Sequence, residues 1–229
     1  DLVRSRGLGD VYKRQSFLFA LQQVAHLIAA GVYHRALIFS SEVGFRSLNP
    51  TEPESAVLFG DSAVAAVVTA APPSSASALH HARFETHASG ADLTRLVGGG
   101  SLHHPNDPTT TPEDNMFHMD GSGVFKKAVR LIGPFLDTFL AETGWRREEI
   151  DCVVPHQASR HGVELLHARL GFRPDQVFTN LAIRGNCIAA SIPLALAEAG
   201  EAGIVRRGSR VLLIGTGAGL TIGAVALTY

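Results

Sequence analysis

One order of elements occurs twice in this chain of 229 residues. It consists of an apolar helix, a glycine, a basic residue, a buried strand, a glycine-rich turn, and a strand of small and β-branched residues. The first copy lies within residues 16–68 and the second within residues 187–227. Alternation of helices with buried strands is typical of sheets that are covered by helices. The repeat therefore predicts an α/β fold built from two similar halves.

The composition narrows the classes of protein to which the chain can belong. With 45% hydrophobic and 18% charged residues, it is typical of a globular protein with a sizeable core. The net charge of -1 argues against a nucleic-acid-binding surface. The two cysteines lack CxxC spacing and predict neither a disulfide framework nor a zinc site. We recognise no signal peptide and no apolar run long enough to cross a membrane, so we expect a reducing, cytoplasmic setting.

Residues 1–15 differ from the rest of the chain. There is no initiator methionine, basic residues gather here, and the sequence turns apolar at Ser16. The segment resembles adapter-derived translations at the ends of metagenomic reading frames, and a disordered basic N-terminus is the alternative. We leave it out of the fold and expect the natural protein to begin well upstream. Residues 72–78, rich in Pro, Ser and Ala, predict a boundary between a first half (16–72) and a second half (73–229).

Periodicity and residue type predict the elements of both halves. Apolar residues at helical spacing predict helices over residues 16–30, 124–143, 160–170 and 188–198. Apolar and β-branched runs predict strands over residues 35–40, 63–69, 79–85, 150–155, 176–178, 209–216 and 222–229. Residues 90–114 have the composition of a long loop, which in a compact domain is either functional or mobile.

Two polar residues lie where predicted strands and helices meet. His156 follows the strand that ends at Pro155 and precedes a helix. A strand end holds a side chain rigidly at the edge of an α/β sheet, and a neutral imidazole there can donate a hydrogen bond into a crevice. Asn186 follows Gly185 and opens the helix of the second repeat. Taken alone, His156 fits a structural or surface role and Asn186 fits a helix N-cap.

Gly215, Gly217 and Gly219 lie between two predicted strands. A dinucleotide-binding loop needs a helix after its glycines, so we reject that interpretation. Glycines between strands permit a tight turn and let a backbone N–H approach an oxyanion. A plain hairpin turn is the alternative.

The cysteines and the paired histidines give weaker signals. Cys152 lies within a strand, where a free cysteine behaves as a small buried hydrophobe. Cys187 is at a helix N-terminus, a position that can lower the pKa of a thiol, and a cysteine hydrolase built on Cys187 and His156 is the third and least favoured hypothesis. The pairs His80-His81 and His103-His104 lack ligand spacing with carboxylates, so we expect solvated side chains and no metal site.

Six segments together are similar to the β-ketoacyl-ACP synthase III family, condensing enzymes of the thiolase superfamily that use acyl carrier protein (ACP). They are SFLFAL, ESAVLFGDSAVAAVV, MDGSGVFKKAV, VVPHQAS, GNCIAASIPLAL and IGTGAGLTIGAVAL. The resemblance covers residues 16–229 and implies a thiolase-like, duplicated α-β-α-β-α layered fold whose first half is incomplete. It also implies that the helices starting near Ser16 and Ile188 pack together in the centre.

The resemblance implies an acyltransferase of fatty-acid or polyketide-type synthesis, which condenses an acyl thioester primer with malonyl-ACP by decarboxylative Claisen chemistry. His156 and Asn186 would bind the malonyl thioester and stabilise its enolate. The backbone N–H of Ala218 would supply one oxyanion-hole donor. Acyl-CoA and ACP thioesters would be the substrates, with no further cofactor. ACP would be the partner of a homodimer, with no nucleic acid and no membrane span.

The chain departs from the family pattern at the nucleophile. The family places a cysteine just before the first repeated helix, at position 14, where this sequence has Arg14. We therefore expect an N-terminally truncated fragment that cannot be acylated; the alternative is a non-catalytic thiolase-like subunit that shapes a partner's acyl tunnel. Ser159 and Cys187 replace the family's usual Asn and Thr, which leaves primer length and the need for decarboxylation open. Missing strands are expected to expose apolar surface and to favour aggregation.

Overall fold

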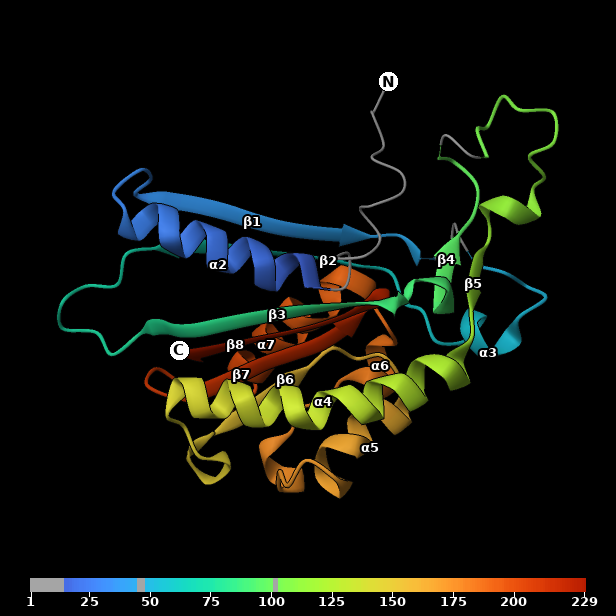
Figure 1. Ribbon diagram of the computed structural model, residues 1–229. Helices are drawn as coiled ribbons and strands as arrows, with labels where there is room; N and C mark the ends of the chain where they lie inside the picture. The colour runs from blue at the N-terminus through green and yellow to red at the C-terminus, as the bar shows by residue number, and fades with distance from the viewer. Residues whose placement is uncertain (1–14, 45–47, 101–102) are drawn as a thin grey trace.

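The computed structural model describes residues 15–44, 48–100 and 103–229, which form successive layers (Figure 1). A ribbon of two antiparallel strands, β1 (Arg35–Glu42) and β2 (Ser62–Thr69), forms one outer layer. A pair of central helices comes next, followed by a four-stranded sheet and then by two further helices. The order of layers is that expected for sheets covered by helices.

The four-stranded sheet has the order β3-β8-β7-β6. Its strands are β3 (Ala78–Gly90), β6 (Cys152–Pro155), β7 (Arg210–Gly217) and β8 (Gly219–Thr228). β6 is parallel to β7, whereas β8 is antiparallel to both β7 and β3. Strands β6, β7 and β8 are almost wholly buried, because helices cover both faces of the sheet.

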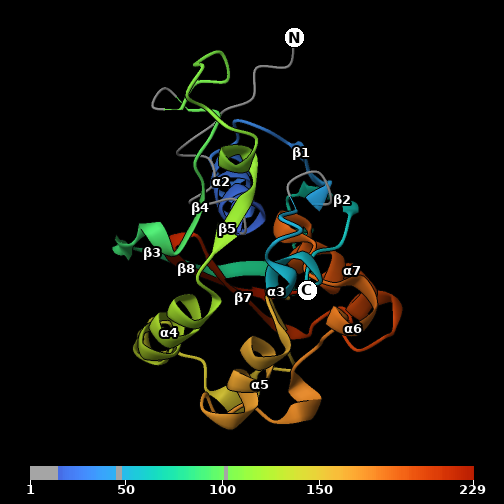
Figure 2. The same ribbon diagram turned by 90° about the vertical axis from the view of Figure 1, so that its right-hand side faces the viewer.

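Helices α4 (Gly121–Thr143) and α5 (Arg160–Ala168) cover one face of this sheet (Figures 1 and 2). The Asp120 carboxylate caps the start of α4 by accepting a hydrogen bond from the Gly123 N–H (2.8 Å). The apolar face of α4 packs on the sheet in one buried cluster, which includes Phe135, Leu136, Phe139, Leu212, Ile214 and Ile222. Each such side chain contributes about 1.5–3 kcal/mol when fully buried, so this cluster stabilises the second half strongly.

Helices α2 (Ser16–Ala29) and α7 (Ser191–Glu201) lie between the ribbon and the other face of the sheet (Figure 2). They are the helices of the two repeats, and a 3₁₀ turn at Ile188–Ala190 precedes α7. One buried cluster joins them and includes Phe17, Leu18, Ile192, Ala195 and Ala199. The predicted packing of the two repeated helices in the centre of the molecule is therefore confirmed.

The outer face of the β1–β2 ribbon is apolar and exposed. Leu37 lies opposite Val67, and Phe39 lies opposite Ala65. The exposed fractions of Leu37, Phe39 and Val67 are 62%, 73% and 65%. The equivalent pair in the second repeat, β7–β8, is instead flanked by β6 and β3 and covered by α4. The predicted exposure of apolar surface is thus confirmed at the ribbon.

The predicted strand around Val177 is wrong. Only Val177 pairs with β6, through a single bridge to Val153, and Pro174–Gln176 forms a 3₁₀ turn. The turn is fixed because the buried Gln176 side chain donates a hydrogen bond to the Ile150 carbonyl (2.6 Å). Gln176 Oε1 also accepts a hydrogen bond from the Arg173 N–H (3.0 Å), and a local bond of this kind favours a turn over a strand.

The region predicted as a long loop is partly regular. β3 continues to Gly90 because it pairs with β8 far beyond Glu85. Strand β4 (Thr94–Leu96) lies within the predicted loop and pairs with β5 (Phe117–Met119). The remaining short elements are α3 (Pro53–Ala56), α6 (Leu181–Arg184) and 3₁₀ turns at Ala91–Leu93, Glu113–Asn115 and Arg147–Glu149. Of the helices in the described ranges, none has the length and apolar character to cross a membrane.

Candidate active site

His156 lies at the end of β6, beside β7. Its backbone N–H donates to the Ile214 carbonyl (2.8 Å), which continues the parallel pairing of the two strands by one residue. The residue is 5% exposed. A Cβ atom at Gly215 would lie 3.0 Å from the Cβ of His156, so glycine at this position makes room for the histidine. The sheet therefore fixes His156 in the interior of the protein.

Gln157 holds the turn that follows His156. Its side chain is fully buried, and Nε2 donates to the carbonyl oxygens of Pro155 (2.9 Å) and Phe178 (3.4 Å). Its Oε1 accepts a hydrogen bond from Thr179 Oγ1 (2.9 Å). Nothing in the sequence distinguishes Gln157 from a surface glutamine except its place directly after His156.

The backbone of Asn186 is held by the first repeat. Its N–H donates to the Leu58 carbonyl (2.6 Å), and its carbonyl accepts from the Gly60 N–H (3.1 Å). Gly185, with a φ of 68°, lets the chain turn into this bridge. A Cβ at Gly60 would lie 2.0 Å from the carbonyl oxygen of Arg184, so this close approach requires glycine.

The side chain of Asn186 reaches the turn that follows His156. Its Oδ1 accepts from the Ile188 N–H (3.0 Å), and its Nδ2 donates to the Ala158 carbonyl (3.5 Å), just beyond His156. The residue is 4% exposed. A primary amide has two N–H donors, and Ala158 uses one of them. The structure thus brings His156 and Asn186, which are distant in the sequence, to one buried place.

The glycine-rich run connects β7 to β8, so the prediction that a strand and not a helix follows it is confirmed. Gly219 has a φ of 119°, a conformation that favours glycine. Ala218 lies at the turn, is 9% exposed, and accepts a hydrogen bond at its carbonyl from Thr221 Oγ1 (3.4 Å). Because β7 pairs with the strand of His156, this turn lies beyond the same end of the sheet. The role of the Ala218 N–H in an oxyanion hole stays a prediction.

The N-terminal end of α2 reaches the same place. Gln15, which precedes the helix, is fully buried, and its Nε2 donates to the Gly215 carbonyl (2.7 Å). Gly215 is also the glycine that makes room for His156, so the N-terminal end of α2 and His156 both lie next to Gly215. The positive end of a helix dipole favours an anion such as a thiolate. Arg14, where the nucleophile is predicted, lies outside the described residues.

The structure argues against the third hypothesis, in which Cys187 is a nucleophile. Burial raises the pKa of the Cys187 thiol, although the nearby Arg184 opposes this shift. The thiol donates a hydrogen bond to the Arg184 carbonyl (3.3 Å), and the residue Cys187 is 1% exposed. Burial also raises the pKa of the Cys152 thiol to about 11, as fits a small buried hydrophobe. Neither thiol has the low pKa of a nucleophile, so the cysteine-hydrolase hypothesis has no support.

The paired histidines make surface contacts. His80 Nε2 lies 2.8 Å from Thr228 Oγ1, and His81 Nε2 lies 2.9 Å from a carboxylate oxygen of Glu142. His104 Nδ1 accepts a hydrogen bond from the Asn106 N–H (3.1 Å). Across the part of the chain that the structure describes, no group of three or more His, Cys, Asp or Glu residues could hold a metal ion.

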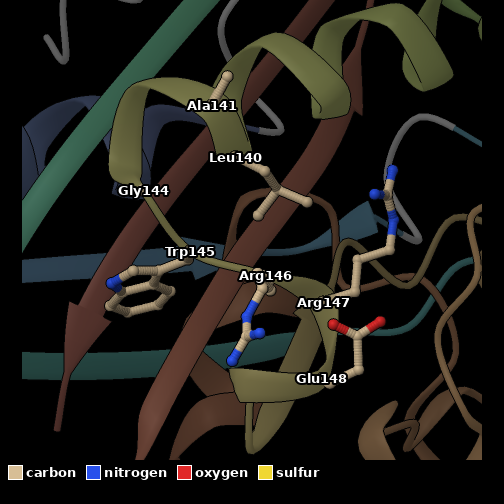
Figure 3. A pocket seen from close by; sticks show the side chains of 7 residues that line it. All are labelled: Leu140, Ala141, Gly144, Trp145, Arg146, Arg147 and Glu148. Atoms are coloured by element: carbon tan, nitrogen blue, oxygen red, sulfur yellow. The ribbon is translucent and has the colours of Figure 1, made fainter.

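A surface pocket of about 390 Å³ lies at the C-terminal end of α4 (Figure 3). The residues that line the pocket come before β6 in the chain, whereas His156 comes directly after β6. The pocket therefore lies at the other end of that strand. Its arginines are already paired: Arg146 contacts Glu149, and Arg147 contacts Asp137. The pocket therefore lies apart from the candidate active site and presents no uncommitted guanidinium group.

Two family models match this chain. The 3-oxoacyl-[acyl-carrier-protein (ACP)] synthase III model matches residues 13–88, and the model of the synthase III C terminal matches residues 140–229. The second match contains His156, Asn186 and the turn at Ala218. The chain belongs to the 3-oxoacyl-ACP synthase III family. The relatives described next have the name β-ketoacyl-ACP synthase III, which is a synonym of 3-oxoacyl-ACP synthase III.

Two synthase III relatives show how much of the family's length is present. The chain is 38% identical over 216 residues to β-ketoacyl-ACP synthase III 3 of Streptomyces coelicolor, covering 93% of this chain and 64% of that protein. It is 37% identical over 215 residues to a β-ketoacyl-ACP synthase III of Nitratidesulfovibrio vulgaris, covering 93% of this chain and 65% of that protein. The chain therefore spans a little less than two thirds of the length of these relatives.

Crystal structures of synthase III proteins share the fold. The protein from Aquifex aeolicus superposes with a TM-score of 0.82 at 31% identity, covering 94% of this chain and 65% of that one. The protein from Pseudomonas aeruginosa superposes with a TM-score of 0.82 at 33% identity, covering 94% of this chain and 64% of that one. The predicted thiolase-like, layered α/β fold is therefore confirmed. The division into segments 1–15, 16–72 and 73–229 stays a prediction.

Proposed function

We propose that this chain carries out the malonyl half of a synthase III condensation: it binds a malonyl thioester and stabilises the enolate that forms when carbon dioxide leaves. The observation that supports this most is the burial of His156 and Asn186 at one strand end, with the Asn186 amide reaching the turn after His156. Two neutral donors with fixed positions suit a developing negative charge on one oxygen.

The proposed step uses the two side chains as hydrogen-bond donors. The bond between the malonyl carboxylate and the central carbon breaks, carbon dioxide departs, and the electron pair moves to the thioester oxygen. His156 and Asn186 would donate to that oxygen. In a buried site such donors are worth more than in water, because few solvent dipoles compete with them. In a full condensation the enolate carbon attacks the carbonyl carbon of an acyl thioester, and the N–H of Ala218 would donate to the oxyanion formed there. The oxyanion then collapses, the C–S bond breaks, and the thiolate departs.

The acyl primer needs a nucleophilic thiol, which this sequence lacks at position 14. Decarboxylation needs only the donors, so we expect the chain to decarboxylate malonyl thioesters without being acylated. With no acyl group to attack, the enolate carbon takes a proton from water, which gives the acetyl thioester. ACP and coenzyme A would carry the two acyl groups, and no further cofactor enters the chemistry. A homodimer in the cytoplasm is part of the same proposal, by analogy with the family.

The test is conversion of malonyl-CoA and malonyl-ACP to the acetyl thioesters, measured by chromatography. The unaltered chain should form acetyl-CoA above the buffer rate, and Asn186→Ala should lower that rate about 10²–10³-fold, as loss of one oxyanion donor does. His34→Ala, at an exposed histidine, is the matched control for His156→Ala. If the chain forms no acetyl thioester above the buffer rate, the proposed function is wrong.

A second measurement concerns the nucleophile. Arg14→Cys should gain the mass of one acyl group on incubation with acyl-CoA, whereas the unaltered chain should not. Acylation of Arg14→Cys supports a condensing enzyme over the alternative of a non-catalytic partner subunit. Absence of acylation in a folded Arg14→Cys chain contradicts the proposed position of the nucleophile.

A further inference from the structure

Helix α6 (Leu181–Arg184) leads into Asn186 but contributes no buried residue to the core. Its Ile183 is 82% exposed. A helix of this length is not stable by itself, and here apolar packing does not hold it. Because the proposed role of Asn186 demands a fixed amide, something else must hold the segment from which it emerges.

One carboxylate holds both ends of α6. Glu198 Oε2 accepts a hydrogen bond from Asn180 Nδ2 (2.8 Å), just before the helix. Glu198 Oε1 accepts from Arg184 Nε (2.7 Å), at the last residue of the helix. Asn180 is 6% exposed and the Glu198 side chain is 21% exposed, whereas the Arg184 side chain is 52% exposed. Solvent therefore screens the contact with Arg184 more than the contact with Asn180.

Glu198 itself stands on a rigid support. It lies on α7, whose Ala195 and Ala199 are fully buried in the central cluster. Burial alone would raise the pKa of the Glu198 carboxyl, but the hydrogen bonds from Asn180 and Arg184 outweigh it and lower that pKa. The carboxylate is therefore ionised at neutral pH and anchors α6 to the core helix.

The clamp acts on Asn186 through the close approach of Arg184 to Gly60. The space that a Gly60 side chain would need is filled by the Arg184 carbonyl oxygen, and the next residues carry the hydrogen bonds between Asn186 and the first repeat. A shift of Arg184 would therefore displace Asn186 from its bridge with Leu58 and Gly60. The same shift would move its amide away from Ala158.

We propose that Glu198 is a positioning residue for Asn186: it clamps Asn180 and Arg184 and so holds the turn that presents the Asn186 amide. The proposal rests on the proposed function, in which that amide stabilises an enolate. Glu198 contacts Asn180 and Arg184 and touches no substrate in this scheme.

The test compares Glu198→Ala with Glu198→Gln and with Glu201→Ala, an exposed glutamate at the end of the same helix. Malonyl-CoA decarboxylation should fall between about tenfold and a hundredfold in kcat for Glu198→Ala, with KM changed less than about twofold, because the amide is misplaced rather than removed. Glu201→Ala should match the unaltered chain.

Glu198→Gln should restore kcat to within about threefold, because a neutral amide can keep both contacts. Its oxygen can accept from Arg184, and its nitrogen can donate to Asn180 Oδ1, which has no hydrogen-bond partner among the described residues. Rescue by this variant separates positioning of the turn from a general effect of charge. If Glu198→Gln is as slow as Glu198→Ala, or Glu198→Ala keeps full kcat, the proposal is wrong.

Hydrogen exchange provides a readout that does not depend on activity. In Glu198→Ala, the amides of Asn186 and Gly60 should exchange at least about tenfold faster, while those of β7 and β8 stay unchanged. Unchanged exchange at Asn186 overturns the positioning role even if activity falls. The unaltered chain could show no decarboxylation while Glu198→Ala still speeds exchange at Asn186 and Gly60. In that case the proposed function is wrong, but the positioning of the turn by Glu198 is supported.

Discussion

The N–H of Gly60 donates a 3.1 Å hydrogen bond to the carbonyl of Asn186, and this bond joins the first repeat to the candidate active site of the second. Residue 60 ends the segment before β2, and Asn186 precedes the central helix α7. The two repeats therefore do more than pack against each other, because the backbone of the first repeat holds the backbone of Asn186 in the second. A change at Gly60 should act on Asn186 without touching its side chain.

Gly60→Ala should disrupt the site from outside it. The added Cβ would lie 2.0 Å from the Arg184 carbonyl oxygen, and backbone cannot yield as a side-chain tip can. We expect a fall of at least about a hundredfold in malonyl-CoA decarboxylation, since a displacement of about 1 Å has that effect on oriented groups. Thermal unfolding should show a lower free energy of unfolding as well.

Gly133→Ala is the matched control for that change. Gly133 lies inside α4, where an added Cβ would meet only Leu170 Cδ2, at 3.9 Å. Alanine in a helix interior is favoured over glycine by up to about 1 kcal/mol, so the control should be neutral or stabilising. Full activity in Gly60→Ala would contradict the placement of Asn186 by the first repeat.

Gln157→Met should loosen the turn that carries His156. Methionine matches the length of glutamine but cannot donate to the carbonyls of Pro155 and Phe178 or accept from Thr179. Leaving buried polar groups without partners should lower the free energy of unfolding by about 1–3 kcal/mol. Urea denaturation measures the loss, and decarboxylation kinetics show its effect on His156.

Gln23→Met, on the exposed side of α2, controls for the change of residue type. It should leave both stability and rate within experimental error. An unchanged rate in Gln157→Met, with a clear loss of stability, would show that His156 does not depend on the Gln157 hydrogen bonds for its function.

The sequence predicted those parts of the fold that depend on local pattern. The helical spacing around Phe17 and the apolar run before Gly215 each correspond to an element of the structure. The same type of pattern failed at Val177, because a buried glutamine one residue earlier bonds to backbone from another segment. The periodicity of the sequence around Val177 gives no sign of the contact between Gln176 and Ile150.

The site was predictable only in part. His156 and Asn186 stand at ends of elements, where the residue type itself is a signal, and the structure brings them together. Glu198 and Gln157 carry no local signal, because their partners come from other turns of the chain. The pKa of Cys187 could not be judged from its place before a helix, because burial is a property of the whole fold.

Both cysteines should resist alkylation in the folded chain. Thiolate is the reactive form, and burial raises the pKa of Cys152 to about 11 and also raises that of Cys187. Iodoacetamide at pH 8 should therefore label neither thiol quickly, whereas both should react in denaturant. Mass spectrometry of timed samples measures this, and fast labelling of Cys187 in the folded chain would revive the nucleophile hypothesis.

The raised pKa of Cys152 also predicts how stability depends on pH. The unfolded thiol ionises near its ordinary value of 9.0, whereas the folded one ionises only near 11. The contribution of the protonated thiol is thus fully present below pH 9 and is lost as pH rises from 9 to 11, by up to about 3 kcal/mol. Cys152→Ala should have a shallower fall of stability over that range. An equally steep fall in this variant would show that other groups cause it.

The exposed face of the β1–β2 ribbon should make the chain self-associate. Leu37, Phe39 and Val67 form an apolar surface on a ribbon whose two strands pair only with each other among the described strands. Exposed apolar strands with unpaired edges are sites of association, and a two-stranded ribbon is marginally stable by itself. The double variant Phe39→Thr/Val67→Thr places threonine, a β-branched residue suited to strands, at two of the three positions of this apolar surface. Sedimentation velocity at equal concentrations should show a shift toward monomer, with the melting temperature unchanged.

Ile38→Thr provides the contrast, because Ile38 points inward and is 7% exposed. Its replacement removes apolar contacts from the central cluster and buries a hydroxyl, so it should lower stability by about 1–3 kcal/mol and increase association. The two variants change opposite faces of the same ribbon and should act in opposite directions. If the double variant sediments as the unaltered chain does, the ribbon face is not the surface through which copies associate.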